Sequence, residues 1–269
     1  MNLQTPTTFI RKKKFPCLLT MVFLLFHLGS TGQTTVRFIV NLQQNDSAYT
    51  TNITVFKWYI SHLKLVDKNR VVWTEKNSYH LLDAFDTTSL SFTLTTPSRI
   101  TFDQIQFGLG IDSITNTSGI LNGPLDPSTG MYWAWQSGYI NFKLEGTDSR
   151  CLSPGGKFEF HLGGYSYPNN SFQELYIPTV SAETIIIYVN PISLLNQIHL
   201  ESSDHIMSPG PQAIQLSKQA TTIFSTNQQW NSGLFSYWLF AGYSPHPLVT
   251  DNTSPPNPKD GPNPFIHCQ

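Results

Sequence analysis

The side chains of this 269-residue chain that could do chemistry are mainly imidazole, indole and thioether groups. His161 lies in the run KFEFHL at Lys157–Leu162, where the alternation of a strand puts it on the face opposite the phenylalanines. His205 precedes Met207 by two residues. Imidazole nitrogen and methionine sulfur favour copper, Cu(I) in particular, over magnesium or calcium. These residues are candidate metal ligands, although a solvated surface histidine would give the same pattern.

A second cluster of candidate residues is the segment GMYWAWQSGY at Gly130–Tyr139. Trp133 and Trp135 stand two apart, so both indoles would share a face if the segment is a strand. They could line a metal site together with Met131. They could also pack in the core, where aromatic side chains contribute strongly, or form an exposed stacking platform with Tyr132.

Motifs of other chemistries are missing from the sequence. There is no Gly-x-Ser-x-Gly elbow, His-Glu-x-x-His helix or phosphate-binding loop, and Gly108-Leu109-Gly110 supplies only the first half of a dinucleotide fingerprint. The spacing within Asp112–Gly119 does not fit an EF-hand. We therefore expect a protein that is not an enzyme.

The first 33 residues have the order of a secretory signal peptide. Basic residues at Arg11–Lys14 precede an apolar run at Phe15–Leu28, and small and polar residues follow up to Gln33. The run is shorter than the roughly 20 residues that span a bilayer, so we expect cleavage near Gln33 and no stable membrane insertion. The product would be periplasmic, cell-surface or secreted. Its first histidine would be His62, which argues against a copper oxidase that uses an N-terminal histidine.

The charge of the remaining chain argues against nucleic acid as a partner. The leader holds four of the 16 basic residues and none of the 17 acidic ones, so acidic residues exceed basic ones by five after cleavage. Binding to phosphates needs clustered Lys and Arg, and no such cluster remains. We expect a monomer.

Two cysteines, Cys151 and Cys268, remain after cleavage. In an oxidising compartment such a pair predicts one disulfide, and two unpaired thiols are the alternative.

Short strand patterns dominate the chain and predict an all-β fold, an antiparallel β-sandwich. In the longest, Ile53–Val66, Phe56, Trp58 and Ile60 share one face at period two. Helical spacing occurs at Gln212–Phe224, which predicts one peripheral helix near the C-terminal third. We divide the chain into a signal peptide (1–33), a β-sandwich domain (34–245) and a Pro-rich tail (246–269).

The stretch Ile105–Leu144 resembles the core signature of the MbnP-like family, periplasmic copper-binding proteins associated with methanobactin-type operons. The matching positions are Phe107, Leu109-Gly110, Asp112, Asn116, Gly123, Leu125, Pro127, Gly130-Met131, Trp133, Trp135, Ser137-Gly138-Tyr139, Phe142 and Lys143–Gly146. Flanking pieces are similar too: Trp58–Ser61, Tyr79–Asp83, Phe158–Gly163 and Met207–Phe224.

The resemblance implies a β-sandwich that binds copper, as Cu(I) or Cu(II), without catalysing a reaction. It implies His161 as the imidazole ligand and Trp133 or Trp135 as the aromatic residue of the site. It also implies a dihaem peroxidase as a partner that oxidises a tryptophan to kynurenine. The alternative function is a cell-surface recognition module that binds glycans or peptides through its aromatic residues.

Overall fold

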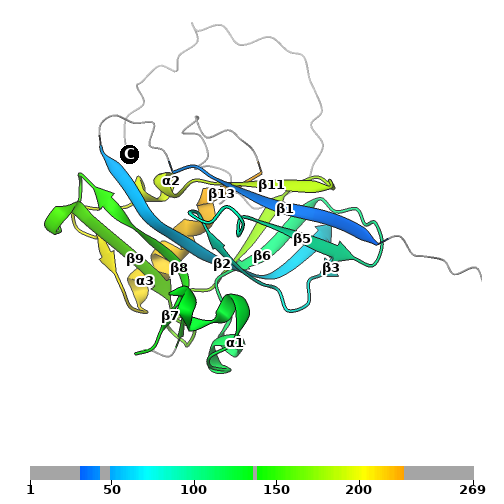
Figure 1. Cartoon of the computed structure of the whole chain (residues 1–269), viewed down its shortest axis with the longest axis horizontal. Coiled ribbons are helices and arrows are strands. Elements are labelled where there is room, and N and C mark those ends of the chain that lie inside the picture. Colours follow the sequence, from blue (N-terminus) through cyan, green and yellow to red (C-terminus); the bar gives the residue numbers. More distant parts are fainter. Residues whose placement is uncertain (1–30, 43–48, 136–137, 227–269) are drawn as a thin grey trace, which may run out of the picture. The chain divides into compact units, whose positions relative to one another are not determined.

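The computed structural model describes residues 31–42, 49–135 and 138–226, and their fold is all-β, as expected (Figure 1). A four-stranded sheet and a nine-stranded sheet form the domain. In the smaller sheet the strand order is β13 (Phe224–Ser225), β11 (Thr184–Val189), β1 (Gly32–Val40), β5 (Ser91–Thr96). In the larger sheet the order is β10 (Gln173–Pro178), β6 (Gln104–Leu109), β2 (Thr51–Asp67), β8 (Gly138–Asp148), β9 (Lys157–Gly163), β12 (His205–Ile206). Strands β3 (Arg70–Thr74) and β4 (Tyr79–Asp83) pair with β2, and β7 (Tyr132–Trp133) pairs with β8.

Most strand pairs are antiparallel, as expected for an antiparallel β-sandwich, but each sheet also contains one parallel pair. β1 pairs in parallel with β11, and β9 pairs in parallel with β12. Parallel partners need a long connection, and here most of the larger sheet lies in the sequence between β1 and β11. Local alternation predicts strands but does not predict which distant strand each one pairs with.

The main core lies between the two sheets and follows from the alternation of β2. Phe56, Trp58 and Ile60 are fully buried on its inner face, as predicted. Phe38 of β1 meets the Trp58 ring edge-on, with 6.0 Å between the ring centroids, so side chains of both sheets share one core. On β9, Phe158, Phe160 and Leu162 belong to this core, which leaves His161 on the outer face.

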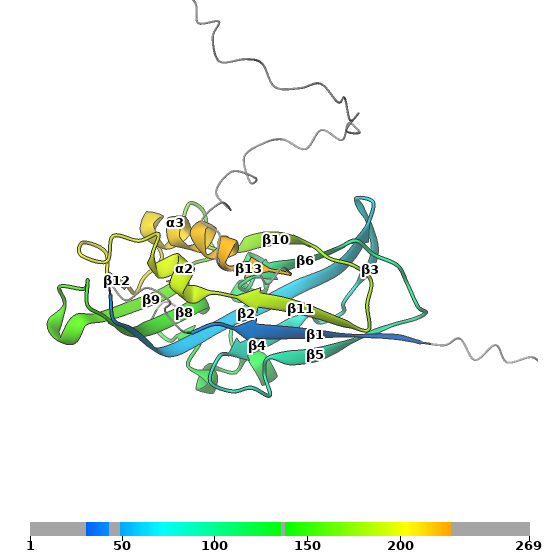
Figure 2. The same cartoon turned by 90° about the horizontal axis from the view of Figure 1, so that it is seen from above.

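The expected helix is present as α3 (Pro211–Ala220), followed by the 3₁₀ turn η4 (Thr221–Ile223). Its buried residues Ala213, Leu216 and Ala220 contact the main core, and Figure 2 shows α3 near the short helix α2 (Pro191–Leu195). Sequence patterns did not predict α2 or α1 (Ser113–Thr117), because five residues are too few for a clear period. Among the described helices none is long and apolar enough to cross a membrane.

Several predictions fall on residues that the structure does not describe. These are the apolar part of the leader, the Pro-rich tail 246–269 and Cys268. Cys151 is buried, and burial is the main cause that raises the pKa of its thiol to about 11. Its pairing with Cys268 stays a prediction, as do the domain boundaries.

Candidate metal site

A second apolar cluster covers the outer face of the larger sheet. The covering chain runs from Ile111 to Trp135, and we call it the cover segment; it includes α1, β7 and the 3₁₀ turns η1 (Gly123–Leu125) and η2 (Pro127–Thr129). Figure 1 shows α1 and β7 on the side of β2 and β8 opposite β1 and β11. The buried members of the cluster are Tyr59, Ile111, Leu125, Met131, Trp133, Tyr139 and Ile140. Most positions that carry the family resemblance lie in or beneath this segment.

Buried hydrogen bonds hold the cover segment on the sheet. The Asn116 side-chain oxygen accepts from the Tyr139 backbone N–H at 2.9 Å, and the Asn116 amide donates to the Ile111 carbonyl at 2.9 Å. The Tyr139 hydroxyl donates to the Leu125 carbonyl at 3.1 Å, and the Tyr59 hydroxyl to the Pro124 carbonyl at 2.8 Å. These side chains therefore have a structural role, since each satisfies a polar backbone group of the cover.

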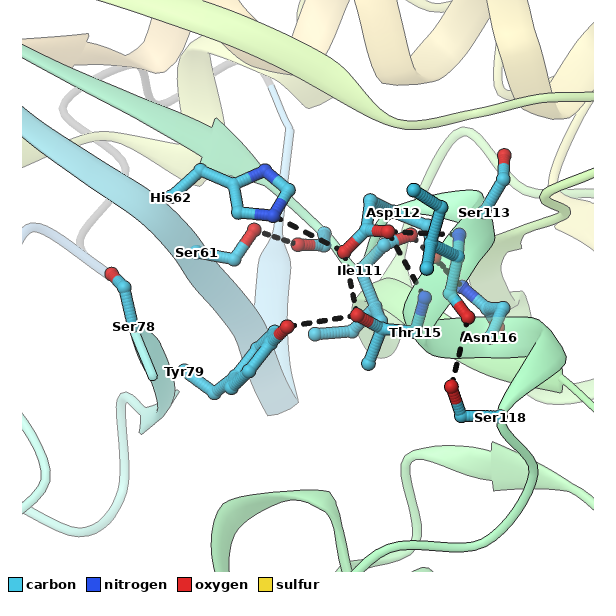
Figure 3. A network of polar contacts seen from close by, with 12 residues as sticks. Ser61, His62, Ser78, Tyr79, Ile111, Asp112, Ser113, Thr115, Asn116 and Ser118 are labelled. Atoms are coloured by element: carbon cyan, nitrogen blue, oxygen red, sulfur yellow. Dashed lines mark hydrogen bonds and ion pairs between the residues drawn. The ribbon is translucent and has the colours of Figure 1, made fainter. Parts of the chain in front are cut away.

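The start of α1 is fixed by a network around Asp112 (Figure 3). Asp112 caps the helix by accepting from the backbone N–H groups of Ile114 and Thr115. The Thr115 hydroxyl donates to the Asp112 carboxylate at 2.7 Å, and the His62 imidazole lies 3.2 Å from it. Although partial burial opposes ionisation, the hydrogen bonds from Thr115 and the nearby His62 lower the pKa of Asp112. The network anchors the cover at the edge away from His161.

His161 lies on the outer face of β9, as predicted, but it is not open to solvent. Its side chain is only 8% exposed. The Nε2 atom lies 2.6 Å from the Glu145 carboxylate on β8. The Nδ1 atom is buried and has no hydrogen-bond partner among the described residues. A buried polar atom without a partner costs free energy, so Nδ1 is a candidate ligand atom.

The charges around His161 define its tautomer. Burial is the main cause that lowers the pKa of His161, and the Glu145 hydrogen bond only partly offsets it. Burial opposes ionisation of Glu145, but the hydrogen bond from His161 and the Lys143 ammonium, 3.2 Å away, lower its pKa. At neutral pH an ionised Glu145 accepts a hydrogen bond from Nε2–H of the neutral imidazole, which leaves the lone pair on Nδ1. A carboxylate that orients a histidine in this way is typical of metal sites.

Trp133 packs against Gly163, which has no side chain to exclude it. A Cβ atom built on Gly163 would lie 2.5 Å from the Cζ3 atom of Trp133 and 2.7 Å from the Tyr139 carbonyl oxygen. The indole therefore occupies the space where a side chain at position 163 would project. His161 and Gly163 are two residues apart on β9, so they share the outer face. The structure thus places Trp133 against Gly163, on the face of β9 that also carries His161.

Trp135 does not share the environment of Trp133, so the prediction that both indoles lie on one strand face was wrong. The strand ends at Trp133, and Ala134 and Trp135 form a turn. Trp133 is 5% exposed and Trp135 is 65% exposed. Their ring centroids are still only 5.7 Å apart, so the exposed indole contacts the buried one.

The two tryptophans should differ in reactivity towards a dissolved oxidant. We expect limiting N-bromosuccinimide to oxidise Trp135 before Trp133, because only Trp135 is accessible. Peptide mass mapping of the two products would measure the order. Oxidation of Trp133 before Trp135 would contradict the arrangement. If each indole reacts independently, the buried tryptophans of a Trp135→Phe variant should be oxidised at the same rate as in the wild type.

Met131 and His205 occupy different places. Met131 is fully buried in the apolar cluster beneath the cover segment. His205 is exposed on β12, where its Nδ1 atom lies 3.2 Å from the Glu159 carboxylate. Within the described residues, no group of three or more His, Cys, Asp or Glu side chains is arranged to hold a metal ion. A metal at His161 would therefore depend on other kinds of donor.

Sequence reasoning did not single out Glu145 and Gly163 as residues of the site. Both lie in stretches that resemble the family, KLEG and HLG, but nothing local shows what they contact. Glu145 reaches His161 only through the pairing of β8 with β9, in which Lys143 stands opposite His161 and Glu145 opposite Glu159. The sequence patterns did not predict the register of this pairing.

The motif residues of the cover segment and the mixed β-sandwich fold both point to a known family. The sequence profile of the MbnP family matches residues 28–208, and the chain belongs to this family. The fold is similar to the solved structure of MbnP from Methylosinus trichosporium, with a TM-score of 0.50 and 13% sequence identity. That match covers 67% of this chain and 82% of the other. No curated protein matches the chain in sequence.

Proposed function

We propose that the protein is an exported, non-catalytic copper-binding protein that acquires or handles copper. The observation that carries the proposal is the Nδ1 atom of His161, which is buried, without a partner, and oriented by Glu145. Family membership supports the same function, and the leader-like N-terminus supports export to the periplasm or cell surface.

The residues around His161 fit copper better than a harder cation. Calcium and magnesium need several carboxylate or carbonyl oxygens, and structural zinc needs four Cys or His ligands. The described residues hold no group of three or more His, Cys, Asp or Glu side chains for such a set, whereas a neutral imidazole suits a soft ion with few ligands. His161 would hold the ion, Glu145 would orient the imidazole, and Trp133 would exclude water.

We expect His161→Gln to weaken copper binding by about 100-fold or more. Loss of an outer partner of a metal ligand costs roughly 10–100-fold in affinity, and loss of the ligand itself should cost at least as much. A competition titration of the exported protein with a Cu(I) chelator would measure the affinity.

A second histidine of the larger sheet provides the matched control. His80 also bonds a carboxylate through Nε2, at 2.8 Å from Glu75, and its ring stacks on Phe92. His80→Gln should leave the copper affinity unchanged. Equal affinities of the wild-type protein and His161→Gln would contradict the proposal.

The partner that we propose is a dihaem peroxidase that converts a tryptophan to kynurenine. Trp133 is the candidate that packs on Gly163, two residues from His161, and Trp135 is the candidate that is accessible to a partner. Intact-mass and peptide analysis of the protein isolated from its native source tests this proposal. Unmodified Trp133 and Trp135 in copper-loaded protein would reject it.

A recognition module is the second candidate function, and one observation favours it. Trp135 is exposed, and so are Ile114 and Ile120 of the same cover segment. A stacking platform built on both indoles is not present, however, because Trp133 is buried. Retention on a glycan panel that is lost in Trp135→Ala, without copper binding, would favour this function over the first.

A further inference from the structure

The cover segment contains a pair of residues whose backbone can react with a neighbouring side chain, Asn122-Gly123. It is the only place in the sequence where an asparagine is followed by a glycine. The amide carbon of an asparagine can be attacked by the backbone nitrogen of the next residue. A glycine at that position hinders the attack least, because it has no side chain and rotates freely. The pair stands at the start of the 3₁₀ turn η1, with Asn122 as its N-cap residue.

Both reacting groups of this pair are free to meet. Asn122 is exposed, and its side chain makes no hydrogen bond with any residue that the structure describes. The Gly123 N–H also has no partner among these residues. Gly123 has a φ of +67°, and nothing lies within 4 Å of a Cβ atom built on it. The nitrogen can therefore approach the amide carbon without displacing a packed neighbour.

The reaction needs no reagent other than water. The Gly123 nitrogen forms a bond to the Cγ atom of Asn122, its proton passes to the amide nitrogen, and ammonia leaves from the resulting cyclic succinimide. Water then adds to one of the two ring carbonyl carbons. Breaking the bond between Cγ and nitrogen gives aspartate, whereas breaking the bond between the backbone carbonyl carbon and nitrogen gives isoaspartate. Neither step oxidises or reduces the chain.

The pair directly precedes the backbone groups that hold the cover segment on the sheet. The Pro124 carbonyl accepts from the Tyr59 hydroxyl at 2.8 Å, and the Leu125 carbonyl accepts from the Tyr139 hydroxyl at 3.1 Å. In an isoaspartate the main chain runs through the former side chain, which lengthens it by one carbon just before these two carbonyls. The two hydroxyls are fixed by the sheet, so a longer chain can no longer meet both with the same geometry.

We propose that Asn122-Gly123 is a site of spontaneous modification, where deamidation and isoaspartate formation loosen the cover segment as the protein ages. The inference is independent of the proposed copper-binding function, because it uses only the exposed pair and the two carbonyls that follow it.

Peptide mapping of the exported protein during incubation in warm, mildly alkaline buffer tests the chemistry. Asn77 is the internal control, because it is also exposed but is followed by a serine. We expect aspartate and isoaspartate to accumulate at residue 122 at least about tenfold faster than at residue 77, since only Gly123 adds no side chain beside the attacking nitrogen. Equal rates at the two residues would overturn the inference.

Hydrogen exchange of the same samples tests the effect on the cover segment. The backbone N–H of Tyr139, which donates to Asn116, should exchange faster in aged than in fresh wild-type protein. Asn122→Ser removes the amide and keeps a small polar residue, so its exchange should be the same before and after incubation. Unchanged exchange in fully converted wild-type protein, or equal acceleration in aged Asn122→Ser, would overturn the inference.

Discussion

Replacing Asp148 by alanine is expected to lower the free energy of unfolding by about 3–5 kcal/mol. The Asp148 carboxylate is fully buried, and the Arg150 guanidinium, 2.7 Å away, is 9% exposed. The carboxylate also accepts from the Thr51 hydroxyl at 2.5 Å, which ties the start of β2 to the end of β8. Removing one partner of a buried pair leaves the other charge uncompensated, which explains the large cost. Chemical denaturation measures it.

The effect of Asp148→Ala should depend on pH. Burial raises the pKa of Asp148, but the hydrogen bonds from Arg150 and Thr51 outweigh it and lower the pKa below its usual value. Because the folded-state pKa is the lower one, the stabilisation is complete above the unfolded pKa, near 3.9, and is lost as the pH falls through the folded value. The difference between wild type and variant should therefore shrink in acid.

Asp67 at the other end of β2 offers a control for this variant. Asp67 makes no ion pair with any residue that the structure describes, and Asp67→Ala should change the stability by no more than about 0.5 kcal/mol. Equal stabilities of Asp148→Ala and wild type at pH 7 would contradict the structural role of the buried pair.

Gly163→Ala is expected to displace Trp133 and to lower the free energy of unfolding by about 1–3 kcal/mol. The added Cβ atom would lie 2.5 Å from the indole and 2.7 Å from a backbone oxygen, so either the ring or β8 has to move. Trp133 should then become accessible to a quencher such as acrylamide. If the proposed site is correct, copper affinity should fall as well, since Trp133 packs on Gly163, two residues from His161.

Gly210 is the matched glycine, because nothing lies within 4 Å of a Cβ atom built on it. Gly210→Ala should keep both the stability and the protection of Trp133. If acrylamide quenches Trp133 equally in Gly163→Ala and in the wild type, the position of the indole does not depend on the absence of a side chain at residue 163. That result would contradict the arrangement proposed for the site.

The strands of the main core follow from the sequence because burial on one face leaves a period of two. Phe56, Trp58 and Ile60 alternate with Lys57 and Tyr59 and face the core. Alternation does not reveal that Tyr59, on the other face, is also fully buried, because its cover comes from residues more than fifty positions away. The parallel pairing of β1 with β11 is equally non-local.

The candidate site was predicted only in part, because some of its contacts come from residues that are distant in the sequence. His161 was singled out by its residue type and its face of the strand, and both hold. Its burial and the role of Glu145 depend on the cover segment and on the register of β8 with β9. The Trp-x-Trp spacing suggested one strand, but the turn at Ala134-Trp135 separates an exposed indole from a buried one.

The positions of the family motif in the fold show that several of its residues have structural roles. Asn116 and Tyr139 hold the cover segment on the sheet, and Asp112 starts α1. The motif thus includes many residues that hold the cover segment in place and few that could contact a ligand.

The most direct test of the central claim is an anomalous difference map, at the copper absorption edge, from a crystal of the copper-loaded protein. The proposed function predicts one peak within bonding distance of the Nδ1 atom of His161, on the face of β9 that also carries Gly163 and Trp133. A peak only at another histidine, such as His62 or His205, or no peak at all, would contradict it.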